Sequence, residues 1–441
     1  MFRHSASAAL LAAASLGLVL TGSGCAKNPE AQFAWRDSTE LLIPDARKTV
    51  QKTMHESFGT PHDLVAWARM PVQYGGLAPA AAATDDAAAG DAAPVDNGPF
   101  GHQLQLGRQV YMKNCLHCHG VAGDGAGPTA RYLNPKPRDY RLGLFKFTST
   151  LAPERITRDD LHRVVKYGIP GTYMPSFLLL DKPGTGDVNT KAVIEYVRWL
   201  AMRGEMEKRI DDELVDYSLA SIDDEIAKAK NSYESAKASG EKADPPPSRS
   251  ALTRKAAGDF KTYLAEDYAD AVDGTADFIA ENWIRADEEA SLIVPKVARV
   301  TDNAASRERG RLLYMSDKTK CYTCHGHTGK GNGPATEDFW PKPGSTEKYA
   351  NRGLHDVWGN KLSPRNLRQG QYRGGRRPVD VFRRIYAGIK TTPMPAFGGT
   401  VLKDEDIWDV VNYVMSLPYE PEVPSAGPAK APRMAATEAR Q

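Results

Sequence analysis

Two stretches of the 441-residue chain decide its fold: GRQVYMKNCLHCHGVAGDGAGP at residues 107–128 and GRLLYMSDKTKCYTCHGHTGKGNGP at residues 310–334. Each holds a Gly-Arg pair, a Tyr-Met pair, a Cys-x-x-Cys-His motif and a glycine-rich run that ends in Gly-Pro. The same features in the same order, in two distant segments, indicate an internal repeat. The sequence therefore predicts two copies of one structural unit.

The likeness between the copies continues beyond these stretches. Residues 160–177 align with residues 380–397 without a gap, and the identities include a Met-Pro pair. Each copy then closes with apolar residues at helical spacing, which predicts a helix that stops near Gly204 in the first copy and at Pro418 in the second. No convincing alternating strand pattern is present. We therefore expect an all-α fold, with three or four helices and long glycine-rich loops in each unit.

The Cys-x-x-Cys-His motif predicts the cofactor. Its residues are Cys115, Cys118 and His119 in the first copy and Cys321, Cys324 and His325 in the second. This motif is the attachment sequence of haem c: two thiols bond to one edge of the porphyrin, and the adjacent histidine reaches the iron. A redox dithiol and a zinc site are the alternatives, although structural zinc needs four ligands at one place. Two copies in a repeat predict two covalently attached haem c groups.

A methionine beside proline occupies the same position in both copies, in Tyr173-Met174-Pro175 and Pro393-Met394-Pro395. A methionine is often core filler. Here the proline keeps the loop out of a helix and stiffens it, so the thioether has a fixed place. We predict Met174 and Met394 as the second axial ligands. Iron held between histidine and methionine is closed to substrate and has a raised potential, which suits electron transfer.

Four further residues are candidates for the haem environment. Pro128 and Pro334 follow the glycine-rich loops, where a backbone carbonyl could orient the axial histidine, although a simple turn is the alternative. Arg138 and Arg365 hold matching positions after a proline. Each guanidinium could pair with a haem propionate, and surface solvation is the alternative.

The N-terminus predicts export. Arg3 and His4 precede a short apolar run from Ala8 to Leu20, too short to span a membrane and typical of a signal peptide. Small residues then lead to Cys25, which resembles the lipid-modified cysteine of bacterial lipoproteins. The alternatives are cleavage elsewhere, giving a soluble periplasmic protein, or an uncleaved anchor. We expect a location on the periplasmic side of a bacterial membrane, with a lipid anchor at Cys25.

Charge is unevenly distributed, although the formal net charge is only +2. The two repeats are basic and the segment between them is acidic. Nine basic residues and one acid lie between Lys361 and Lys390, which indicates either a solvated face or a docking patch. No nucleic-acid motif accompanies the charge, so we expect an acidic redox protein as partner.

The repeated motifs, together with Gly107 and Gly310 on the helices that precede them, resemble the class I cytochrome c domain. In that family this glycine lets the first helix cross the last one closely. The paired arrangement is similar to the di-haem subunit of cbb-type haem–copper oxidases. The predicted organisation is a signal peptide (1–24), an N-terminal segment and flexible tether (25–98), cytochrome c domain 1 (99–206), an acidic helical insertion (207–304), cytochrome c domain 2 (305–420) and a disordered tail (421–441).

The resemblance implies a carrier of single electrons between a respiratory donor and an acceptor such as a terminal oxidase or reductase complex, without independent catalysis. The chain departs from the oxidase subunit in its acidic insertion and in having no later stretch apolar enough to cross a bilayer. A di-haem redox enzyme, peroxidase-like or thiosulfate-oxidising, is one alternative. A structural subunit of a respiratory complex is another.

Overall fold

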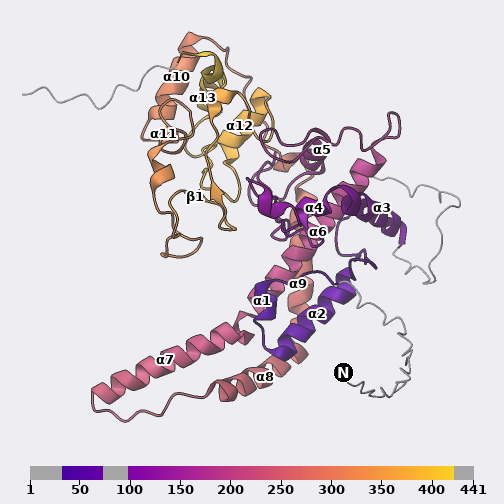
Figure 1. Ribbon diagram of the computed structural model, residues 1–441, viewed down its shortest axis with the longest axis vertical. Helices are drawn as coiled ribbons and strands as arrows, with labels where there is room; N and C mark the ends of the chain where they lie inside the picture. The colour runs from indigo at the N-terminus through magenta and orange to yellow at the C-terminus, as the bar shows by residue number, and fades with distance from the viewer. Residues whose placement is uncertain (1–31, 73–97, 422–441) are drawn as a thin grey trace, which may run out of the picture.

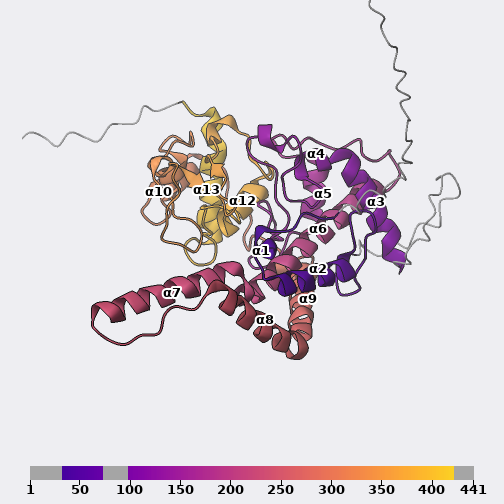
Figure 2. The same ribbon diagram turned by 60° about the horizontal axis from the view of Figure 1, so that its bottom comes forward.

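The computed structural model describes residues 32–72 and 98–421 of the chain. Two helical units lie side by side, and a long helical arm projects from the first of them (Figures 1 and 2). The predicted signal peptide, Cys25, the tether up to residue 97 and the tail from residue 422 lie outside the described residues. No helix in the described part of the chain is both long and apolar enough to span a bilayer.

The two units are built from the same succession of helices, as the repeat predicts. The first contains α3 (Gly98–Asn114), α4 (Leu116–His119), α5 (Arg158–Tyr167) and α6 (Val188–Glu213), and the second contains α10 (Ala304–Met315), α11 (Cys321–His325), α12 (Pro378–Ala387) and α13 (Asp404–Ser416). In each unit the first helix packs against the last. The predicted all-α fold is confirmed.

Short elements complete the units. They are the 3₁₀ turns η1 (Ala130–Tyr132), η2 (Val215–Tyr217), η3 (Glu289–Ser291), η4 (Pro334–Glu337), η5 (Leu367–Gln369) and η6 (Leu417–Tyr419). In the second unit β1 (Leu354–His355) pairs antiparallel with β2 (Lys361–Leu362). Strands of two residues are too short to leave an alternating pattern in the sequence, which explains why this hairpin was not predicted.

Gly107 and Gly310 allow the first and last helices of each unit to cross in close contact. A Cβ on Gly107 would lie 2.1 Å from the carbonyl oxygen of Ala192 on α6, and a Cβ on Gly310 would lie 2.0 Å from that of Asp409 on α13. Both distances are far shorter than van der Waals contact. The close crossing expected from the family resemblance is therefore confirmed in both units.

Helix α6 does not stop near Gly204, contrary to the prediction, and it continues to Glu213. The glycine serves a close approach instead, because a Cβ there would lie 2.4 Å from the Cα of Arg141. The charged side chains on either side of Gly204 are buried and paired: Arg203 lies 3.1 Å from Glu207, and Glu205 pairs with Arg155. The predicted boundary between residues 206 and 207 therefore falls inside one helix.

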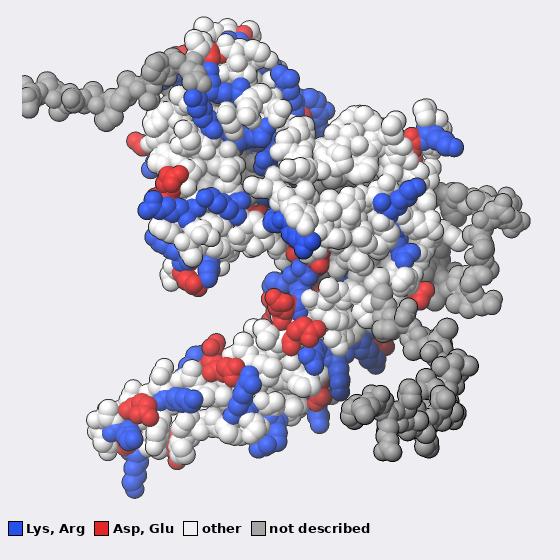
Figure 3. All heavy atoms as spheres, viewed as in Figure 1, with Lys and Arg blue, Asp and Glu red and all other residues white. Residues whose placement is uncertain are grey.

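The acidic segment is built onto the first unit. Helix α9 (Tyr268–Arg285) returns alongside α6, and its buried Ile279 and Trp283 join the first hydrophobic core. Helices α7 (Leu219–Ala238) and α8 (Arg249–Glu266) form the arm between α6 and α9 (Figures 1 and 2). Acidic and basic side chains are interspersed along this arm (Figure 3).

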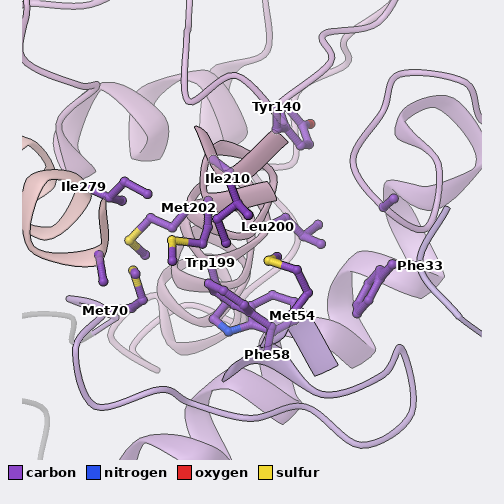
Figure 4. Packing of buried hydrophobic residues seen from close by; sticks show 14 of the residues in the cluster. Phe33, Met54, Phe58, Met70, Tyr140, Trp199, Leu200, Met202, Ile210 and Ile279 are labelled. Carbon is purple, nitrogen blue, oxygen red and sulfur yellow. The ribbon is translucent and has the colours of Figure 1, made fainter. Parts of the chain in front are cut away.

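The N-terminal segment is also part of the first core rather than a separate element. Helices α1 (Asp37–Glu40) and α2 (Pro44–Phe58) pack against α6. The rings of Phe33 and Phe58 lie 5.8 Å and 5.7 Å from the ring of Trp199 on α6, in the packed cluster of Figure 4. The core of the first unit therefore includes residues that precede its repeated segment in the sequence and residues that follow it.

We predict that Gly107→Ala lowers the free energy of unfolding by roughly 3 kcal/mol, because the added methyl group overlaps the backbone of α6. Gly258→Ala is the matched control, since nothing lies within 4 Å of a Cβ at that position on α8. It should raise stability by about 0.5–1 kcal/mol through helix propensity. Chemical unfolding followed by circular dichroism measures both. Equal stability of the two variants would contradict the close crossing.

Candidate functional site

The two Cys-x-x-Cys-His motifs each form a single helical turn, directly after α3 in the first unit and five residues after α10 in the second. All four cysteines, Cys115, Cys118, Cys321 and Cys324, carry free, half-buried thiols. In a helical turn, side chains three residues apart lie on the same face. Both sulfur atoms of each motif are therefore available to one flat group placed against that face.

The glycine-rich loop after each motif folds back onto it. The amide of Gly127 donates to the carbonyl of Cys118 at 3.2 Å, and the amide of Gly333 donates to the carbonyl of Cys324 at 3.1 Å. A Cβ on Gly127 would lie 2.4 Å from the carbonyl oxygen of Leu116. Only glycine fits this approach, which explains why the loop sequence is repeated.

The histidines of the two motifs are oriented by backbone carbonyls. The Nδ1 atom of His119 lies 3.2 Å from the carbonyl oxygen of Arg138, and that of His325 lies 3.3 Å from the carbonyl oxygen of Arg365. The sequence analysis gave this role to Pro128 and Pro334, so the assignment is corrected. In each unit the carbonyl that contacts the imidazole ring comes from the later Pro-Arg pair, at Arg138 or Arg365.

Burial keeps both imidazoles neutral. It lowers the pKa of His119 to about 4, and it lowers the pKa of His325 as well. Because a carbonyl oxygen only accepts, Nδ1 carries the proton and the lone pair is left on Nε2. This is the tautomer that binds a metal through Nε2, with the second nitrogen fixed by an outer partner.

The two methionine loops have the same hydrogen bonds. The carbonyl of Met174 accepts from the amide of Ile169 at 3.1 Å, and that of Met394 accepts from Ile389 at 3.2 Å. The preceding threonine side chain in each loop accepts from the methionine amide, at 3.1 Å and 3.3 Å. Both methionines are half-buried. Each thioether thus sits on a loop of defined shape, which agrees with the predicted ligand role.

Sequence reasoning missed three tyrosines. The buried hydroxyl of Tyr111 donates to the carbonyl of Gly120 at 2.8 Å, and that of Tyr314 donates to Gly326 at 2.7 Å, which ties the first helix to the end of the motif. Their identical place in the repeat was the available signal. The ring of Tyr140 stacks on His119 at 4.8 Å, whereas Leu367 holds the matching place in the second unit.

The guanidinium groups of Arg138 and Arg365 both lie at the boundary between the units. That of Arg138 stacks over the ring of Trp358 in the second unit at 4.1 Å. That of Arg365 donates to the backbone and side-chain oxygens of Gln371 at 2.8 Å and 2.7 Å. Pairing of these arginines with haem propionates stays a prediction. Nε1 of Trp358 is buried nearby without a protein partner, which adds one more donor for a carboxylate.

The residues at each motif fit a covalently bound haem. Two free thiols, a neutral imidazole with its Nδ1 fixed, and a thioether on an ordered loop would together supply the attachment points and both axial ligands of such a group. Within residues 32–72 and 98–421, no three His, Cys, Asp or Glu side chains gather where they could hold a metal ion, so the zinc alternative has no ligand set there.

Comparison with known proteins agrees with this chemistry. A family model described as cytochrome c matches residues 104–201 and 308–418. No curated protein matches the chain. Among solved structures, a chain of the reducing HAO-like protein complex of Kuenenia stuttgartiensis matches with 24% identity and a TM-score of 0.42, over 71% of this chain and 96% of that one.

We predict that Tyr140→Leu destabilises the first unit by about 1 kcal/mol more than Tyr140→Phe, because only the phenyl ring keeps the stack on His119. Thermal unfolding of the two variants measures the difference. The Tyr140→Leu variant should also shift the resonances of the His119 ring in NMR spectra. Identical unfolding curves and unshifted ring resonances would show that the stack contributes nothing.

Proposed function

Because residues 104–201 and 308–418 are two cytochrome c domains, each of which binds one haem c, we propose that the protein carries single electrons between a respiratory donor and an acceptor such as a terminal oxidase or reductase complex. The observation that carries this proposal is the presence of a histidine and a methionine loop of matching geometry in both domains. Two irons with both axial positions filled pass electrons and leave no position for a substrate.

The protein's own residues set the conditions for this transfer. The carbonyls of Arg138 and Arg365 fix the orientation of the axial histidines. The loops of Met174 and Met394 supply thioethers, which favour the reduced iron and raise its potential. Haem c supplies the one-electron chemistry, and the protein supplies ligands, orientation and burial.

We place the protein on the periplasmic side of a bacterial membrane, exported by residues 1–24 and anchored through a lipid on Cys25. The short apolar run followed by small residues and a cysteine supports this placement. A lipid anchor would hold the two domains close to a membrane-bound donor or acceptor. The partner we propose is an acidic surface of a redox protein, because the domains carry an excess of basic residues.

We predict that Met174→Leu and Met394→Leu each remove half of the methionine-to-iron charge-transfer absorbance of the oxidised protein and lower the potential of one haem. Leucine fills the same space but offers no lone pair to the iron. Optical spectroscopy and redox titration of the purified protein measure both effects.

Met112→Leu and Met315→Leu are the controls, because these methionines repeat on the helices before the motifs and are not ligand candidates. Neither should change the spectrum. High-spin iron in the unsubstituted oxidised protein would overturn the carrier function and favour the di-haem enzyme.

We predict that Cys25→Ser moves the protein from the membrane fraction to the soluble periplasmic fraction without changing its haem content. Fractionation followed by haem staining tests this. Unchanged membrane association would show that Cys25 is not the anchor, whereas the haem sites would be unaffected by that result.

A further inference from the structure

The loops that carry the two proposed methionine ligands also take part in the contact between the two cytochrome c domains. In the second domain, Lys390 lies in the loop that leads to Met394. Its ammonium group donates to three oxygens of the first domain: the carbonyl of Glu154 at 2.7 Å, the hydroxyl of Thr150 at 3.3 Å and the carbonyl of Leu151 at 3.4 Å.

The ammonium group of Lys390 uses all of its donors in this contact. An ammonium group has three donors, and here all three have acceptors in the first domain. Lys390 is half-buried, and burial lowers the pKa of its ammonium group to about 8. A lysine in this position fixes its loop against the neighbouring domain and is not part of a solvated face.

The reciprocal contact involves the loop of Met174. Gly171 lies in that loop, and its carbonyl accepts from Nη2 of Arg373 in the second domain at 3.3 Å. The guanidinium of Arg365 lies against the same residue, since a Cβ on Gly171 would be 2.7 Å from Nη2 of Arg365. The carbonyl of Arg365 in turn orients His325. One residue of the second domain therefore touches the ligand loop of the first haem and holds the histidine of the second.

Other contacts keep the domains in this register. Arg384 on α12 donates to the carbonyl of Thr148 at 2.8 Å, and the amide of Ile293 donates to the carbonyl of Ser149 at 2.8 Å. Lys146 of the first domain pairs with the buried Asp356 of the second at 3.3 Å. In Figure 1, α12 of the second domain faces the region of α5 in the first. The basic run from Lys361 to Lys390 is thus used largely within the molecule.

We propose that each domain holds the methionine loop of the other, so that Lys390 and Arg373 are positioning residues for the sixth iron ligands. The proposal rests on the proposed ligand roles of Met394 and Met174. If a loop loses its contact with the opposite domain, its methionine is held only by hydrogen bonds within the loop. The thioether then leaves the iron more readily, and the potential of that haem falls.

The test isolates one iron at a time in the full-length protein with both haems bound. In a Met174→Leu background, the remaining charge-transfer band belongs to Met394, and adding Lys390→Met should weaken that band and lower the potential of the same haem. In a Met394→Leu background, Arg373→Met should weaken the band of Met174 and lower the potential of its haem. Lys390→Arg keeps the donors and should largely restore the band.

Lys342→Met and Arg311→Met are the matched controls, because both side chains are exposed and pair within their own domain, with Glu347 and Glu308. Neither should change the band. Haem content and circular dichroism establish that each variant is folded, and Lys390→Gln replaces Lys390→Met if that variant does not fold.

Unchanged bands and potentials in the folded Lys390 and Arg373 variants would overturn the proposal and leave the carrier function intact. If Met174→Leu and Met394→Leu themselves left the charge-transfer absorbance unchanged, the ligand assignment would fail first. The two failures are therefore distinguishable from the same set of spectra.

Discussion

The close crossing of the first and last helices in each domain is the constraint on which the rest depends. It exists because Gly107 and Gly310 present no side chain to the backbone of the partner helix. The crossing fixes the position of the first helix, and the motif follows at once in the first domain and after five residues in the second. Tyr111 and Tyr314 then tie that helix to the end of the motif through buried hydrogen bonds. Each thiol and imidazole is thereby placed relative to the core of its domain.

Close approach of backbone segments also determines the geometry of the glycine-rich loops beside the motifs. Glycines let backbone approach backbone, and the carbonyls brought close in this way fix the tautomer of each histidine. The loops therefore act on His119 and His325 through main-chain atoms, which tolerate changes of side chain. This explains how the two domains keep the same geometry although Tyr140 in one is replaced by Leu367 in the other.

The repeat, the all-α fold and the cofactor could be predicted because they depend on short local patterns. What failed were features that depend on distant contacts. Gly204 was predicted to end a helix, whereas the backbone of Arg141 requires it inside one. The carbonyl that orients His119 was expected at the loop of Pro128, whereas the one that meets the ring belongs to Arg138, whose side chain alone had been considered. Lys390 belongs to a basic run that resembles a solvent-exposed face. The oxygens that accept its hydrogen bonds lie in the other domain, more than 200 residues away in the sequence.

The two hydrophobic cores differ in how far apart their residues lie along the chain. The first gathers residues from Phe33 to Trp283, whereas the second is assembled from Ile293 to Leu417. Contacts between distant residues slow folding, since long loops must close before the contacts form. The C-terminal domain should therefore be the faster of the two to fold. Until Trp283 is in place to complete the core of the first domain, the first thiol pair is open to chemical attachment.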